Sequence, residues 1–112
     1  MQNLVTAIRE EFEALERTLS DPGIVSHPKK LAEFGKRRTE LLEILSAAEA
    51  LEKTERTMRE NAALINSETD PDMQALAFED NARLAARKPL EEAILKKLLL
   101  PKDPRSARDV IV

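Results

Sequence analysis

Three consecutive cations, Lys36, Arg37 and Arg38, form the group in this sequence best suited to hold an anionic partner. Lysine and arginine side chains gain free energy at a phosphate backbone because their binding releases condensed counterions. The alternative is that the three residues form a solvated stretch of helix, in which Arg38 lies over neighbouring apolar side chains. Solvated helix stretches of this kind are commoner than partner contacts, so of the two hypotheses we favour the solvated stretch.

A second candidate surface carries the opposite charge. Residues 67–82 contain five carboxylates and no basic residue, whereas residues 83–108 contain eight basic residues and three acidic ones. At the start of the acidic segment, Ser67, Glu68 and Asp70 could contact a basic partner, or could only cap the neighbouring helices. The uneven distribution of charge is more informative about partners than the net charge of -3.

Catalytic chemistry has no visible set of residues here. The sequence has no Cys and a single His, His27, which excludes a thiolate nucleophile, a Cys-ligated metal and a histidine pair. It also lacks a glycine-rich phosphate loop and any nucleophile motif. The nearest approach to an acid/base set is four carboxylates: Glu10, Glu11, Glu13 and Glu16. Because they lie in an amphipathic segment, a solvated helix face explains them better, and we expect no enzyme activity.

Helices must position these residues, because apolar side chains recur every three or four positions along most of the chain. The first series is Leu4, Ile8, Phe12, Leu15 and Leu19. This series predicts a helix over residues 4–19. Pro22 and Gly23 then predict a turn, since proline cannot continue the ladder of hydrogen bonds and glycine tolerates positive φ.

Two longer helices follow the turn. We expect the second over residues 28–65, with a proline in its first turn, where the missing N–H is harmless. Asp70 is suited to cap a third helix that begins at Pro71. Pro89 lies inside this third helix, where it removes one backbone hydrogen bond and clashes with the carbonyl four residues back. We therefore expect a kink near residues 85–89, or a break into two pieces.

Together these elements predict an all-α fold. A short helix would pack on a long antiparallel helical hairpin, giving three helices in a coiled-coil-like arrangement. If the hairpin turns near residue 68, its register sets Arg56 beside Asp80 and Glu40 beside Lys96. Exposed pairs of this kind select the register more than they stabilise the fold.

The composition changes at the end of the chain. Val110, Ile111 and Val112 are β-branched residues that favour a strand. We therefore expect residues 1–105 to form the helical domain, and residues 106–112 to be an extended tail that starts a strand of a following domain. No apolar run approaches the roughly 18 residues that a membrane span needs, so we expect a soluble, non-secreted protein.

Four segments carry a resemblance that covers essentially the whole chain. They are Leu19-Ser20-Asp21-Pro22, Asp70-Pro71-Asp72-Met73, Leu98-Leu99-Leu100-Pro101-Lys102-Asp103-Pro104 and Asp109-Val110-Ile111-Val112. The third segment is the most specific of them. On these segments the chain resembles the N-terminal helical domain of bacterial class I peptide chain release factors, those of the factor 1 type more than those of the factor 2 type.

The resemblance implies a cytoplasmic protein of translation termination. Such factors recognise stop codons on the ribosome and trigger peptidyl-tRNA hydrolysis with a Gly-Gly-Gln tripeptide and a Pro-x-Thr motif. Neither motif occurs in this sequence, so no catalytic residue carries over. The family's first domain reaches toward the stalk-base region of the large ribosomal subunit, near the GTPase release factor 3. We therefore expect an interaction domain with no small-molecule substrate, cofactor, metal or membrane contact.

The resemblance also suggests roles for the candidate residues. Partner contacts would be Lys36, Arg37, Arg38, Ser67, Glu68 and Asp70. The joint to the following domain would be Pro101, Lys102, Asp103 and Pro104. Pro89 departs from the mostly uninterrupted third helix of the family, which puts the direction of the hairpin tip in question. The competing hypothesis is a free-standing structural coiled coil or dimerisation module, whose exposed apolar stripe is covered by a second copy.

Overall fold

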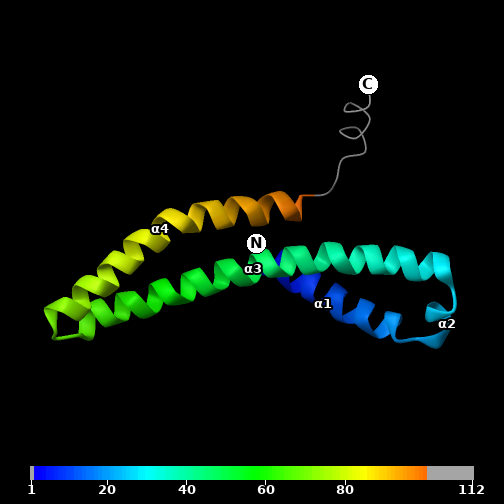
Figure 1. The fold of residues 1–112 in the computed structure, drawn as a ribbon, viewed down its shortest axis with the longest axis horizontal. Coiled ribbons are helices and arrows are strands. Elements are labelled where there is room, and N and C mark those ends of the chain that lie inside the picture. The colour runs from blue at the N-terminus through cyan, green and yellow to red at the C-terminus, as the bar shows by residue number, and fades with distance from the viewer. Residues whose placement is uncertain (1, 101–112) are drawn as a thin grey trace, which may run out of the picture.

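The computed structural model describes residues 2–100, and these residues are almost entirely helical. The helices are α1 (Gln2–Leu19), α2 (Pro22–Val25), α3 (Pro28–Ser67) and α4 (Pro71–Leu99). No strand occurs among the described residues. The molecule is 62 Å long, with α3 as its spine and α1 and α4 lying along it (Figure 1). The predicted all-α class and the long antiparallel hairpin are confirmed.

The tail lies outside the described residues. This holds for the proposed joint, Pro101 to Pro104, and for the strand expected at residues 106–112. Both therefore stay predictions, and so does the domain boundary placed after residue 105.

The short helix α2 is a difference from the three-helix prediction. We expected a plain turn there, but Asp21 caps a single turn of helix by accepting the N–H of Gly23 at 3.0 Å. Pro22 occupies the first position of that turn, where its fixed φ suits a helix. A capping residue followed by proline is therefore sufficient to form one helical turn where the sequence indicated only chain reversal.

Similar caps begin the two long helices. The Nδ1 atom of His27 accepts the N–H of Lys30 at 3.4 Å, and Pro28 follows as the first helical residue of α3. Asp70 caps α4, as predicted, with Pro71 in the next position. Both predicted starts are confirmed, whereas α3 ends at Ser67, two residues later than predicted.

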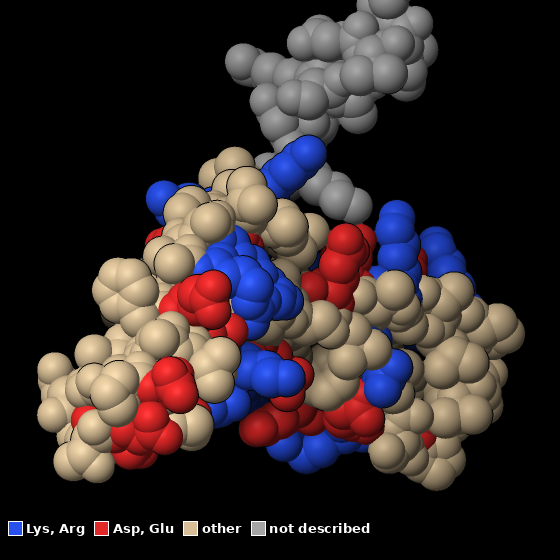
Figure 2. Space-filling view, turned by 60° about the vertical axis from the view of Figure 1, so that its left-hand side comes forward, with Lys and Arg blue, Asp and Glu red and all other residues tan. Residues whose placement is uncertain are grey.

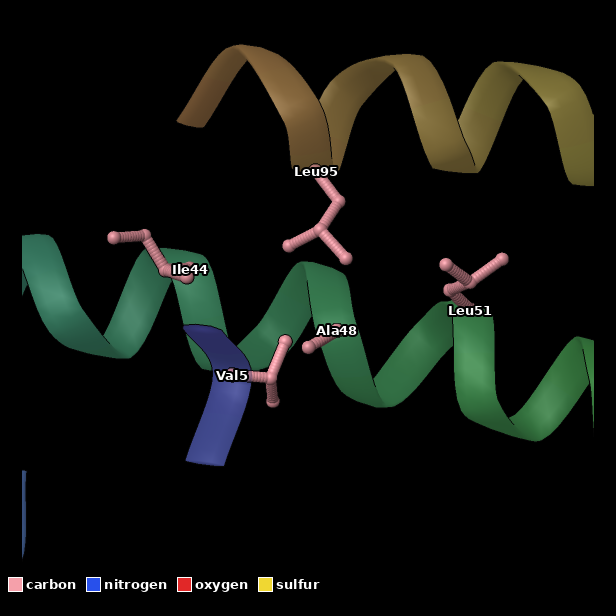
Figure 3. Packing of buried hydrophobic residues seen from close by; sticks show 5 residues of the cluster. All are labelled: Val5, Ile44, Ala48, Leu51 and Leu95. Atoms are coloured by element: carbon pink, nitrogen blue, oxygen red, sulfur yellow. The ribbon is translucent and has the colours of Figure 1, made fainter. Parts of the chain in front are cut away.

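The main core lies where all three long helices meet. Ile44, Ala48 and Leu51 of α3 are buried between Val5 of α1 and Leu95 of α4 (Figure 3). Half-buried residues pack around this cluster: Ile8, Ala47, Leu98 and Leu99. We call this part of the molecule, formed by α1, α3 from its start to Leu51 and the end of α4, the base.

The opposite end of the molecule is the hairpin tip, formed by the end of α3 and the start of α4 alone (Figure 1). Its register differs from the prediction, because Asp80 contacts Asn61 at 2.8 Å and Arg83 at 2.7 Å in place of Arg56. Asn61 lies five residues nearer the turn than Arg56. Glu40, at the base, accepts a hydrogen bond from Arg37.

Pro89 bends α4 without breaking it. The helix continues from Pro71 to Leu99 with the proline inside, so of the two predicted outcomes the break does not occur. Figure 1 shows α4 bent between its yellow and orange parts. The cause is the missing N–H of the proline, together with its clash with the preceding turn.

Candidate interaction surfaces

Arg37 of the cation cluster is held at the contact between α1 and α3. Its Nε and Nη2 atoms donate to the two carboxylate oxygens of Glu11 at 2.6 and 2.9 Å. Its Nη1 atom donates to Glu40 at 3.2 Å. The bond from Arg37 lowers the pKa of the Glu11 carboxyl and raises the pKa of Arg37, against the opposing effect of desolvation. This bidentate pair fastens α1 to the spine.

Arg38 also turns toward α1. Its Nε atom pairs with the carboxylate of Glu16, and its guanidinium carbon lies 5.4 Å from the centroid of the Phe12 ring. The guanidinium thus lies over an apolar neighbour, which is the arrangement of the alternative hypothesis for this residue. Lys36 differs from both arginines, because it is exposed. A partner contact at the three cations stays a prediction, with Lys36 the most accessible of them.

Two carboxylates of α1 form ion pairs that the periodicity of the sequence did not predict. The sequence indicated a solvated face for Glu11 and Glu16, yet each is about half exposed and paired with an arginine of α3. The pairing depends on how α1 lies across α3, and spacing along a single helix does not determine that arrangement.

The three predicted contact residues of the loop all have local hydrogen bonds. Ser67 donates its hydroxyl to the carbonyl of Ala63 at 2.8 Å. Glu68 accepts the next two backbone N–H groups, each at 3.1 Å. Asp70 accepts the N–H two residues further on at 3.0 Å. The structure brings them together at the end of the hairpin, where they close the loop and stay open to solvent on at least one side.

Polar side chains join the two helices behind this loop. Gln74 donates to the carbonyl of Ile65 at 3.0 Å, and Asn81 donates to the carbonyl of Met58 at 3.1 Å. Asp80 is held by Arg83 and Asn61, which lower the pKa of its carboxyl. These bonds join α3 to α4 in the tip, next to the small buried apolar contact of Ala77 and Leu84.

Three exposed apolar side chains on the first turns of α4 are the feature that the sequence analysis missed. Met73, Leu76 and Phe78 are 43%, 60% and 68% exposed. They lie within the acidic segment of residues 67–82, and Figure 2 shows red and tan side chains, without blue ones, at the nearer end of the molecule on its lower left. Phe78 lies off the buried stripe of Ala77 and Leu84, and this position was the available signal.

Every buried side-chain nitrogen or oxygen between residues 2 and 100 has a hydrogen-bond partner. No group of three or more His, Cys, Asp or Glu side chains in the described part of the chain could hold a metal ion. None of the described helices combines the length and the apolar character needed to cross a lipid bilayer.

Comparison with known proteins agrees with the resemblance noted in the sequence. The model of the PCRF domain matches residues 8–112. The chain is 33% identical to peptide chain release factor 1 of Chlorobaculum tepidum over 112 residues, which is all of this chain and 31% of that protein. Proteins of the same name from Chloroherpeton thalassium and Lysinibacillus sphaericus are each 31% identical over 112 residues, again covering all of this chain and 31% of the relative.

The chain thus spans about a third of the length of the curated relatives that it matches. No solved structure matches it. Because the family model covers nearly every residue, the chain belongs to the PCRF domain family.

Proposed function

We propose that this chain is the ribosome-interaction domain of a peptide chain release factor of the factor 1 type. In this proposal it acts in translation termination, in the cytoplasm, by positioning the factor on the ribosome. The family match over residues 8–112 supports the assignment. The elongated shape supports this role. Two helices, each held by its own backbone hydrogen bonds, place the tip far from the base without a large core (Figure 1).

Stop-codon recognition and peptidyl-tRNA hydrolysis would belong to other parts of such a factor. The chain contains neither a Gly-Gly-Gln tripeptide nor a Pro-x-Thr motif. Its own contribution would be binding and orientation, not catalysis.

The tip offers the chemistry for a protein partner. Residues 67–82 carry five carboxylates and no cation, so they repel the phosphates of RNA and favour a basic surface. Exposed apolar side chains such as Phe78 supply anchors that a partner pocket can desolvate. We therefore assign the tip to a basic protein surface in the stalk-base region of the large subunit, close to the GTPase release factor 3.

One observation carries this assignment. Phe78 is 68% exposed, lies outside the buried stripe of α4 and belongs to the acidic segment of residues 67–82. An exposed aromatic ring in the tip of a long hairpin is typical of a surface that is covered by a partner. Within the cation cluster, exposed Lys36 is the better candidate for a second contact than Arg37 or Arg38, which pair with α1.

The test is co-sedimentation of the 112-residue chain with ribosomes through a sucrose cushion. We expect saturable binding, and we expect Phe78→Ser to weaken it about tenfold, since truncating an interface anchor typically costs more than 1 kcal/mol. Ile94→Ser is the matched control, because Ile94 is 56% exposed on the same helix but lies at the base. Equal binding by both variants, or no binding by the parent chain, would overturn the proposal.

The dimerisation module is the second candidate, favoured by the exposed side chains of Leu90 and Ile94. These two residues are four apart on α4 and flank Ala47 and Ala50 of α3, which leaves an open apolar groove. Sedimentation velocity at micromolar concentration separates the candidates. We expect a monomer, whereas a tight dimer would favour the module.

A further inference from the structure

The middle of α4 is anchored differently from its two ends. Its buried side chains are Ala77 and Leu84 toward the tip, and Leu95 in the base. Between them, residues 85–94 are all described by the structure and contain no buried residue. Nearly three turns of helix therefore lie between two apolar anchors without one of their own.

Polar contacts take the place of apolar ones in this interval. Thr54, the buried polar residue of α3, donates its hydroxyl to the Glu91 carboxylate at 2.5 Å. The Glu91 side chain is only 11% exposed and also lies 3.7 Å from Arg87, one turn earlier. Lys88 reaches Glu55 of α3 at 3.5 Å. These contacts surround the position of the proline.

Pro89 weakens the helix at the same place. It donates no hydrogen bond to the carbonyl of Ala85, and its ring pushes that turn open. Ala85 is exposed, so water can satisfy the carbonyl at any bend angle. A segment with a missing backbone bond, no buried apolar contact and a polar attachment has the properties of a local hinge.

We propose that residues 85–91 of α4 form a hinge, in which Pro89 permits the bend and the hydrogen bond from Thr54 to Glu91 sets its angle. The second half of α4 then takes a direction that does not depend on the packing of the tip. The two halves of α4 can thus be oriented separately along an intact spine. This inference does not rest on the proposed function, because it concerns only contacts within the chain.

The hinge is tested by distances between pairs of spin labels. The chain has no Cys, so an introduced pair is unique. Glu49 of α3 and Lys96 of α4 are both exposed and report how far the second half of α4 lies from the spine. Glu49 with exposed Ala75 reports the first half of α4 in the same way, and serves as the control pair.

Two variants address the two parts of the hinge. Pro89→Ala restores the backbone bond, and we expect it to shift the mean Glu49–Lys96 distance by about 3–4 Å, the displacement of a roughly 10 Å arm that turns by about 20°. Thr54→Val removes the hydroxyl with little change of shape, and we expect it to broaden that distance distribution.

The controls make the result decisive. Thr39→Val removes a hydroxyl that bonds only within α3, to the carbonyl of Gly35, and we expect it to change neither distance. The Glu49–Ala75 distance should stay constant in every variant. If Pro89→Ala and Thr54→Val both leave the Glu49–Lys96 distribution unchanged, or if both pairs shift together, the hinge does not exist.

Discussion

The base and the tip of this molecule are held together by different forces. In the base, three helices bury a continuous apolar cluster around Ala48 and Leu95, and ion pairs such as that of Arg37 with Glu11 lie at its edge. In the tip, residues 55–67 of α3 are all described and none is buried, and the buried apolar residues of α4 there are Ala77 and Leu84. There, side-chain amides bonded to backbone carbonyls hold α3 against α4.

The difference indicates that the two ends of one hairpin have different roles, the base in stability and the tip in presenting exposed side chains. The base is stabilised by apolar burial, which is strong and does not depend on direction. The tip is stabilised by hydrogen bonds, which fix its register but contribute less free energy each. Phe78 lies outside the buried contact of Ala77 and Leu84, so its side chain remains available to a partner.

The largest effect that tests this comparison is expected in the base. Leu95→Ala removes a side chain that is 2% exposed and touches the cluster of all three helices. We expect it to lower the free energy of unfolding by about 2–5 kcal/mol, measured by denaturant titration. Leu90→Ala is the matched control on the same helix, and its exposed side chain should cost no more than about 0.5 kcal/mol. Equal losses would contradict an apolar base.

A smaller and more local effect is expected in the tip. Asn81→Ala removes the bond to the carbonyl of Met58 and the acceptor for Asn61, whose side chain lies 3.1 Å away. We expect a loss of about 1–2 kcal/mol, since each such bond contributes about 1 kcal/mol. Amide hydrogen exchange should accelerate around the end of α3 and the start of α4 while the base stays protected. Faster exchange across the whole chain would mean that the two regions unfold as one.

The smallest effect concerns the ion pair of Arg37 with Glu11, which joins α1 to α3 and which we call the clamp. Its contribution to stability depends on pH. The pKa of Glu11 is lowered in the folded state, so the clamp stabilises the fold above the ordinary pKa of a glutamate and loses this effect as pH falls through the lowered folded pKa. At neutral pH, Glu11→Gln should cost about 0.2–1 kcal/mol, the range for exposed ion pairs.

The same titration supplies the control for the clamp. As the solution becomes strongly acidic, the difference in unfolding free energy between Glu11→Gln and the parent chain should shrink toward zero. Glu10→Gln, on the exposed side of α1, should match the parent at neutral pH. A difference for Glu11→Gln that grows on acidification would contradict the assigned role of this carboxylate.

Much of the fold follows from local patterns in the sequence. Proline after a capping residue locates the starts of α3 and α4, and the spacing of apolar residues gives the helices and the antiparallel hairpin. Pro89 predicts the bend. These features succeed because each one is determined within a few residues along the chain.

The register and the candidate contacts depend on relations between helices. The neighbour of Asp80 across the hairpin is Asn61 in place of Arg56, a shift of five residues that depends on how α3 and α4 pack together. The way α1 crosses α3 determines that Arg37 and Arg38 meet carboxylates, while Lys36 remains exposed. No single-helix pattern contains that information, although the spacing of Ala77 and Leu84 along α4 does leave Phe78 outside the buried stripe.

The most direct test of the division between base and tip is hydrogen exchange of the 112-residue chain with and without ribosomes. We expect ribosomes to slow exchange at the tip, in the segment from the loop after α3 to the second turn of α4, and to leave the core around Leu95 unchanged. Slower exchange confined to the base, or no change at a ribosome concentration that saturates co-sedimentation, would contradict the assignment of the tip as the binding surface.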